Sequence, residues 1–231
     1  MDGFEPPHLL GDLSAKIRGV GQFALRAGTD DIIHVLSARE RAVRNVLEQR
    51  LRPGDVFVDA GANIGFFSVI ASNLVGESGQ VIAFEMMPET AARLRHHFAI
   101  NDLPSAKIFE RALFDKDGET ITATSSAQKF GQASVSPEFQ AEPGRTIRHD
   151  VPTVRLDTAL ADIGDIALMK MDLEGAELGA LLGAKDVLAR CAAVIFENNS
   201  KDERVVGLLR SAGFSIRHLG GREHLAYRSE E

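Results

Sequence analysis

A carboxylate and two glycines directly follow a short apolar run near residue 56, in a pattern suited to binding a nucleotide cofactor. Residues 56–58 are apolar, Asp59 follows them, and Gly61 and Gly65 flank Asn63 in the next turn. Glycine at 61 would let the backbone pass close to a ligand, and glycine at 65 would let the following helix pack tightly on the sheet. We therefore predict that this segment is the cofactor-binding end of a parallel strand, with Asp59, Gly61, Asn63 and Gly65 as binding residues.

The glycine spacing indicates which cofactor binds. A dinucleotide-binding turn follows the pattern G-x-G-x-x-G, but Asn63 and Phe66 occupy the second and third glycine positions here. A carboxylate at 59 would also repel a pyrophosphate, whereas it suits a ligand with a cationic amino-acid end. S-adenosylmethionine (SAM) has such an end, and we predict that it is the cofactor.

A second acid ends the next predicted strand. The run 80–84 is short and mostly apolar, and Glu85 follows it 20 residues after Gly65. An acid at this distance binds the ribose hydroxyls in nucleotide-binding folds. A solvated acid in a loop is the alternative, and the pairing with Asp59 favours the ribose role.

Three motifs together resemble the FkbM family of SAM-dependent methyltransferases. They are DAGANIG at 59–65, AFEMMPE at 83–89 and MKMDLEGAE at 169–177. The first alone indicates only a class I methyltransferase, whereas the third is much more particular to this family. The resemblance extends from about residue 30 to the C-terminus.

The resemblance also implies where the adenine would lie. Glu110 and the backbone around Ala112 are candidates for its edge, and Met86 or Met87 for its ring face. The family more often carries Pro-Asn where this chain has the two methionines, so this position departs from the pattern. Polarisable methionine side chains can still cover a purine ring.

The fourth strand of the predicted sheet ends in the candidate catalytic residues. Asp172 follows the run 166–171, so it would lie at the carboxyl edge, beside the methionine end of the cofactor. We predict that Asp172 orients the acceptor hydroxyl or the amino group of the cofactor. Lys170 shares its face and would either lower the pKa of the hydroxyl or pair with Asp172 or Asp59, and we favour the structural pair.

Further polar residues are predicted to line the acceptor site. Glu174, Gly175 and Glu177 open the next helix, where capping alone could explain both acids, and Glu197 and Asn198 end the fifth strand at the same edge. Asp172, Glu197 and Asn198 could alternatively hold a divalent cation, because such oxygen ligands suit magnesium. We favour an assignment without a metal.

Residues 125–150 are rich in polar residues, glycine and proline, and the hydrophobic periodicity fades there. Long segments of this kind are often lids. We predict a lid over the acceptor, in which His149 could accept a proton from a sugar hydroxyl.

Composition and charge restrict the class of protein. The chain has 231 residues, 44% of them hydrophobic, and a net charge of −7, which indicates one enzyme domain and disfavours a nucleic-acid partner. We predict a soluble, cytoplasmic protein without a membrane span, and leave open whether it forms a homo-oligomer. Cys191 is the single cysteine, so an internal disulfide is excluded.

The order of predicted elements is that of an α/β fold. A hairpin is expected from 22–26 and 32–36, with loose residues before Gly21, as an N-terminal extension (1–36). The domain 37–231 would begin with a helix opened by a capping box, Ser37 with Glu40. Alternating strands and helices then predict a three-layer, Rossmann-like class I methyltransferase sheet of seven strands whose last pair is antiparallel.

These features together predict a methyltransferase acting on oxygen. The acceptor would be a hydroxyl on a saccharide, a nucleotide sugar or a polyketide-type natural product, so the partner is a small molecule or a glycan. An NAD-dependent oxidoreductase is one alternative, although the glycine spacing disfavours it. A non-catalytic SAM-binding module is the other.

Overall fold

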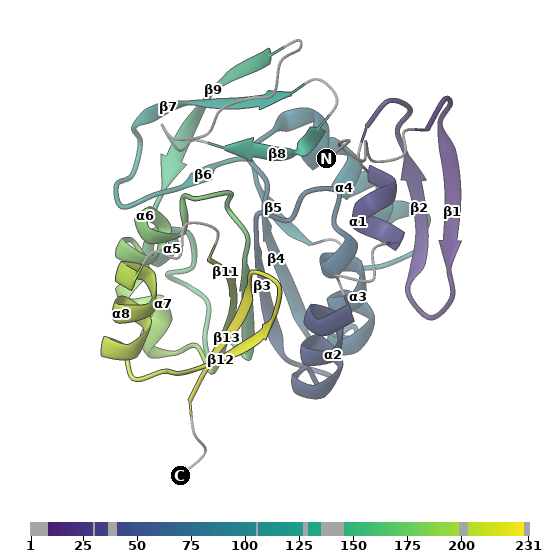
Figure 1. Cartoon of the computed structure of the whole chain (residues 1–231). Helices are drawn as coiled ribbons and strands as arrows, with labels where there is room; N and C mark the ends of the chain where they lie inside the picture. Colours follow the sequence, from purple (N-terminus) through teal and green to yellow (C-terminus); the bar gives the residue numbers. More distant parts are fainter. Residues whose placement is uncertain are drawn as a thin grey trace.

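A central sheet flanked by helices on both faces forms the body of the protein in the computed structural model (Figure 1). The structure describes residues 9–29, 31–36, 41–104, 106–126, 129–134, 146–198 and 203–228. None of the helices in these ranges combines the length and apolar character needed to cross a lipid bilayer.

The central sheet contains seven strands in the described part of the chain, in the order β12-β13-β11-β10-β3-β4-β5. β13 runs antiparallel to both of its neighbours, and the other neighbouring pairs are parallel. The predicted fold class is therefore confirmed. The strands are β3 (Val56–Ala60), β4 (Gln80–Phe84), β5 (Lys107–Phe109), β10 (Leu168–Met171), β11 (Ala193–Glu197), β12 (Ser215–Gly220) and β13 (Glu223–Tyr227).

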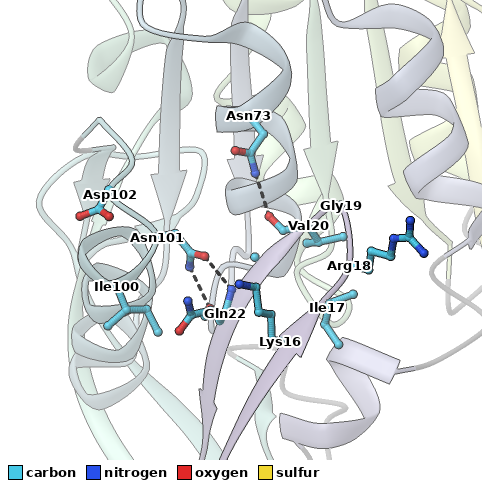
Figure 2. A pocket seen from close by; sticks show the side chains of 11 residues that line it. Lys16, Ile17, Arg18, Gly19, Val20, Gln22, Asn73, Ile100, Asn101 and Asp102 are labelled. Atoms are coloured by element: carbon cyan, nitrogen blue, oxygen red, sulfur yellow. Dashed lines mark hydrogen bonds between the residues drawn. The ribbon is translucent and has the colours of Figure 1, made fainter.

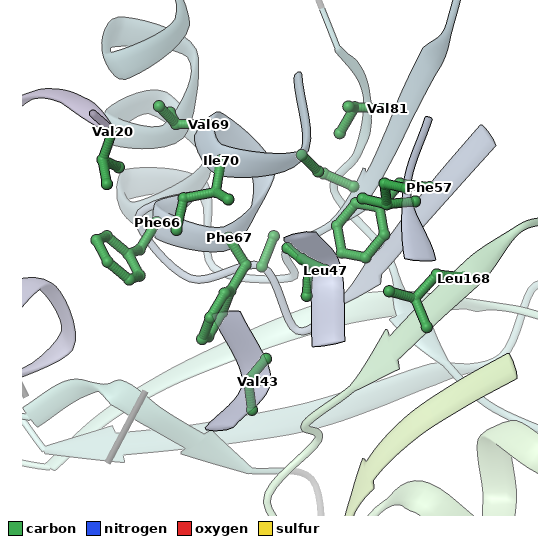
Figure 3. Close-up of a cluster of buried hydrophobic side chains, with 14 of the residues drawn as sticks. Val20, Val43, Leu47, Phe57, Phe66, Phe67, Val69, Ile70, Val81 and Leu168 are labelled. Atoms are coloured by element: carbon green, nitrogen blue, oxygen red, sulfur yellow. The ribbon is translucent and has the colours of Figure 1, made fainter. Parts of the chain in front are cut away.

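Each face of this sheet has its own hydrophobic core, because successive strand residues point to opposite sides. Phe57 and Leu168 enter the core that also contains Leu47, and Figure 3 shows these side chains together. Val58 and Met169 enter the second core. The first core is covered by α2 (Arg41–Arg50), α3 (Phe66–Val75) and α4 (Pro88–Ile100), and the second by α5 (Leu156–Ala159), α6 (Glu177–Leu182), α7 (Lys185–Ala189) and α8 (Glu203–Ser211).

The N-terminal extension is a hairpin and a helix, but not the hairpin predicted. β1 (Leu13–Ile17) pairs with β2 (Gly21–Leu25), so residues 13–17, which were expected to be loose, form a strand. The segment expected to be its second strand is instead helix α1 (Asp31–Leu36). The prediction was wrong because a short apolar run does not by itself distinguish a strand from a helix. The proposed capping box, Ser37 with Glu40, lies outside the described residues.

Although His96 and His97, in a helix with Arg93 and Arg95, have the sequence pattern of a solvated face, His97 ties this hairpin to the rest of the fold. Its ring is fully buried. Nδ1 donates a hydrogen bond to the Ile64 carbonyl (2.7 Å), and Nε2 accepts one from the Ala24 amide (3.0 Å). Burial lowers the pKa of His97, because the charged imidazolium would lose its hydration.

A second sheet stands at the carboxyl edge of the first, where β5 leads into it (Figure 1). Its strands follow the order β6-β9-β7-β8: β6 (Ala112–Leu113), β9 (Thr146–Val154), β7 (Thr120–Ser126) and β8 (Lys129–Ser134). The run 107–113 has the sequence pattern of a single strand, but it is divided between the two sheets as β5 and β6. Much of the segment expected to be an irregular lid is β-structure, and residues 135–145 lie outside the described ranges.

His97 should make the stability of the protein depend on pH. Since its pKa is lowered by folding, the folded protein binds fewer protons, and stability should fall as the pH drops below the value of the unfolded chain, about 6.5. His97→Gln should lower the free energy of unfolding by about 1–3 kcal/mol near pH 7.5. Between that pH and about pH 5.5, the free energy of unfolding should fall less in the variant than in the wild type.

Urea unfolding at several pH values measures this effect as the difference between variant and wild type. That difference cancels the contributions of the buried carboxyl groups. His96→Gln is the matched control, because His96 is the exposed neighbour on the same helix. Parallel pH curves for His97→Gln and wild type would show that His97 is not the titrating group.

Candidate functional site

The loops after β3 and β10 meet at the point where the strand order reverses, which is where α/β sheets bind ligands. Gly61 has φ +82°, and a Cβ there would overlap the carbonyl oxygen of Asp172. This glycine was predicted to make room for a ligand, but the structure fills that space with the neighbouring loop. Gly65 similarly admits Leu94 of α4 rather than the sheet.

Asp59 is buried in the middle of the sheet, with 1% of its surface exposed. Its Oδ2 accepts a hydrogen bond from the Ser68 hydroxyl (2.6 Å). Among the described residues, its Oδ1 has no hydrogen-bond partner. Burial raises the pKa of Asp59, and the positive charge of Lys170 partly opposes this. The unpaired oxygen marks a place where a ligand donor would be stabilised.

Lys170 lies opposite Asp59 in the register of β10 and β3, and its Nζ binds Asp172 Oδ2 at 3.1 Å. The predicted structural pair is therefore present. The Lys170 side chain is only 4% exposed, against 34% for Asp172, and its ammonium also lies 5.2 Å from the Phe67 ring centre. Burial acts to raise the pKa of Asp172, but the charge and hydrogen bond of Lys170 outweigh it and lower the pKa. Asp172 is held as a carboxylate.

Glu85 holds the turn after β3. Its two carboxylate oxygens accept hydrogen bonds from the Asn63 amide (2.9 Å) and the Met87 amide (2.8 Å). Burial raises the pKa of Glu85 to about 7, against the effect of these donors. Asn63 has φ +50°, and its buried side-chain oxygen has no partner in the described ranges. Asn63 and Asp59 thus each present an unsatisfied buried oxygen.

Three acids cluster where β10 and β11 end. Asp172, Glu174 and Glu197 each offer an oxygen, and these oxygens lie within 4.8 Å of one another. Glu174 thus joins Asp172 and Glu197, two of the three residues considered as metal ligands from the sequence; the third, Asn198, directly follows β11. Burial and then the charge of Asp172 raise the pKa of Glu174 to about 7, so a proton can relieve the repulsion within the cluster.

Glu177 has a structural task in the loop after β10. Its buried carboxylate accepts hydrogen bonds from the amides of Leu173 (2.9 Å) and Gly175 (3.3 Å). It therefore fixes the loop that carries Asp172 and Glu174. Glu177 is also the first residue of α6, where its charge suits the positive end of the helix dipole, but its hydrogen bonds hold the loop and do not cap the helix.

The remaining predicted residues lie farther along the carboxyl edge. Glu110 forms an ion pair with Arg95 of α4 on the surface. Ala112 is buried in β6, and half-buried Met86 packs against the small core that contains Ala112. His149 lies on β9 in the second sheet, and no hydrogen bond or ion pair joins it to Asp172 in the described part of the chain.

Two basic residues of the N-terminal extension also act on the site, and the sequence reasoning missed them. Arg26 binds the Asp31 carboxylate with its side chain at 2.7 and 2.9 Å, and its charge lowers the pKa of Glu85. His34 of α1 likewise acts to lower the pKa of Asp172 and of Glu174, by less than burial raises it. His34 was missed because 32–36 was predicted to be a strand, and Arg26 because it was placed in the other strand of the same hairpin. The available signal was Asp31 beside Thr29, a helix-starting pattern.

A groove of about 800 Å³ lies elsewhere, between the turn of the N-terminal hairpin and the C-terminal ends of α3 and α4 (Figure 2). Asn101 bridges the amide and carbonyl of Gln22, and Asn73 donates to the Val20 carbonyl. These contacts attach the hairpin to the helices. The groove is at the amino edge of the sheet, so it is separate from the site.

Comparison with solved structures defines the class of the fold. The precorrin-6y C5,15-methyltransferase of Geobacter metallireducens aligns with a TM-score of 0.53 over 84% of this chain and 91% of its own, at 14% identity. The architecture is that of the class I SAM-dependent methyltransferases.

Comparison of sequences identifies the family. The model of the methyltransferase FkbM domain matches residues 59–216, and the chain belongs to the FkbM methyltransferase family. The 31-O-demethyl-FK506 methyltransferase FkbM of Streptomyces tacrolimicus is 29% identical, over 72% of this chain and 75% of that protein. The 2-O-methyltransferase NoeI of Sinorhizobium fredii is 27% identical, over 69% of each chain.

The acidic cluster should not need a metal, because Lys170 already compensates Asp172 and a proton on Glu174 reduces the remaining charge. Treatment with EDTA should leave the thermal unfolding midpoint unchanged, and added Mg²⁺ should shift it by less than about 1 °C. A larger Mg²⁺-dependent rise that is lost in Glu174→Gln would instead establish a cation site.

Proposed function

We propose that the protein transfers a methyl group from SAM to a hydroxyl of a saccharide, a nucleotide sugar or a polyketide-type small molecule. The observation that carries the proposal is the pair of unsatisfied buried oxygens, on Asp59 and Asn63, at the switch point of a methyltransferase fold. Oxygen as the methylated atom is supported by the names of the relatives from Streptomyces and Sinorhizobium.

The residues at the carboxyl edge fit SAM in charge and in hydrogen-bonding capacity. Asp59 Oδ1 would accept a hydrogen bond from the amino group, and Glu85 would accept from the ribose hydroxyls with the lone pairs that its two amide donors leave. The turn with Gly61 and Gly65 would follow the nucleoside. Met86, Ala112 and Glu110 are assigned to the adenine side.

Bound SAM would supply an activated methyl group, so the protein has to align the acceptor and remove a proton. Asp172 would orient the acceptor hydroxyl, because Lys170 holds it ionised and fixed in direction. Glu174, Glu197 and Asn198 would bind other polar groups of the acceptor. His149 is assigned as a proton acceptor, which requires the lid predicted over residues 125–150 to cover the acceptor.

Incubation with labelled SAM tests this function directly. The protein is given a panel of nucleotide sugars, glycans and macrolide hydroxyls, and mass spectrometry detects a gain of about 14 mass units, a methylene. We expect one class of acceptor to be methylated on oxygen, with formation of S-adenosylhomocysteine. A non-catalytic module would bind SAM in calorimetry yet form no S-adenosylhomocysteine, and an oxidoreductase would bind NAD instead.

Asp172→Asn tests the catalytic assignment. Loss of an oriented carboxylate should reduce kcat by about 10²-fold or more, with less than about threefold change in the Kd for SAM. Circular dichroism checks that the variant folds, because the change leaves Lys170 without its counter-charge. Asp186→Asn, at an exposed position on α7, is the control. Equal losses in turnover and SAM affinity would make Asp172 a cofactor ligand.

A further inference from the structure

A second groove, of about 480 Å³, lies between α8 and the β12–β13 hairpin, beside the end of β11. It is distinct from the hairpin groove at the amino edge of the sheet. Its polar lining is formed by Asn198, Glu203, Arg210, His218, Arg222 and His224. We call it the α8 groove.

The charge of the α8 groove is opposite to that of the protein. Its charged lining residues are two arginines, Arg210 and Arg222, and one acid, Glu203, whereas the whole chain has a net charge of −7; Glu197, which pairs with Arg222, lies outside the lining. Glu203 and Arg210 lie on the same face of α8, seven residues apart. A local excess of positive charge on an acidic protein favours an anionic ligand at this place.

The two histidines of the α8 groove are fixed in orientation. His218 Nε2 binds the Gly221 carbonyl at 3.0 Å, and His224 Nδ1 binds the Arg222 carbonyl at 2.9 Å. Because a carbonyl oxygen only accepts, both nitrogens are donors, and the other nitrogen of each neutral ring is an acceptor that a saccharide hydroxyl can meet. The rings lie 5.0 Å apart, and His224 stacks on Phe196 at 5.3 Å.

Arg222 connects the α8 groove to the acidic cluster. Its NH1 lies 3.8 Å from Glu197 Oε1, and its side chain is 66% exposed. A long ion pair at this exposure is weak, so Arg222 can also reach an anion in the groove. Asn198, which directly follows β11, lines the groove as well. A molecule bound in the groove would therefore extend towards the residues assigned to the acceptor.

We propose that the α8 groove binds a phosphate or carboxylate group of the acceptor, so that the acceptor is an anionic saccharide. This inference rests on the proposed methyl transfer for the claim that the ligand is the acceptor. Guanidinium groups bind phosphate and carboxylate in two-pronged, charge-assisted geometry, and an accepting imidazole nitrogen suits the hydroxyl groups of the same saccharide. Arg210, Arg222, His218 and His224 provide both kinds of group around one cavity.

Calorimetric titration with three probes tests the inference on the full chain. Glucose 1-phosphate represents the phosphate source, glucuronate the carboxylate source, and glucose the uncharged saccharide. At least one anionic probe should bind about tenfold or more tightly than glucose, and the anion that binds identifies the source. Equal binding of all three probes, or none, would overturn the proposal.

Three variants locate the binding site. Arg210→Gln should raise the Kd of the anionic probe about tenfold. Glu203→Gln should lower that Kd about threefold, because it removes the opposing charge. Arg217→Gln is the matched control, since Arg217 is exposed on β12 but points to the opposite face from Ile216 and His218. Equal effects of Arg210→Gln and Arg217→Gln would place the anion elsewhere.

The same variants separate this inference from the proposed function. SAM titration should give an unchanged Kd in Arg210→Gln, because Arg210 is remote from Asp59 and Glu85 in the fold. If SAM binds and a neutral acceptor is methylated while the anionic probes do not bind, the inference fails and the function stands. If SAM does not bind but the anion does, the proposed function fails and the groove remains a binding site of another kind.

Discussion

The ion pair between Lys170 and Asp172 is the interaction on which the site depends. Lys170 is buried in the central sheet beside Asp59, and a buried ammonium is costly unless a counter-charge holds it. Asp172 provides that charge at the first position after β10. The pair therefore determines where the loop leaves the strand and keeps Asp172 ionised, while the burial of Asp59 raises its pKa.

The loop after β3, on the other side of the switch point, is held by a different set of hydrogen bonds. Glu85 accepts two backbone amide hydrogen bonds and so fixes the turn that contains Asn63. Arg26, from the N-terminal extension, adds positive charge near Glu85, and His34 of the same extension acts to lower the pKa of Asp172. His97 attaches that extension to the domain through the Ala24 amide. The extension is thus part of the site, although the family match begins at residue 59.

The carboxyl edge has regions of opposite charge. The acidic cluster of Asp172, Glu174 and Glu197 meets the α8 groove at Arg222. The cluster suits hydroxyl groups, which donate to carboxylates, and the groove suits anions. A saccharide that carries a phosphate or carboxylate would satisfy both regions at once. The second sheet stands at the same edge, so a lid formed by it would cover this surface.

The sequence by itself determined the central sheet, because strands buried on both faces appear as apolar runs, and the acids that end them must meet at one edge. It also determined the family, through motifs that are local. Only the tertiary structure decided that residues 31–36 form a helix, that 107–113 divide between two sheets and that His97 is buried. Those outcomes depend on which segments pack against each other, and a short run with two possible periodicities does not contain that information.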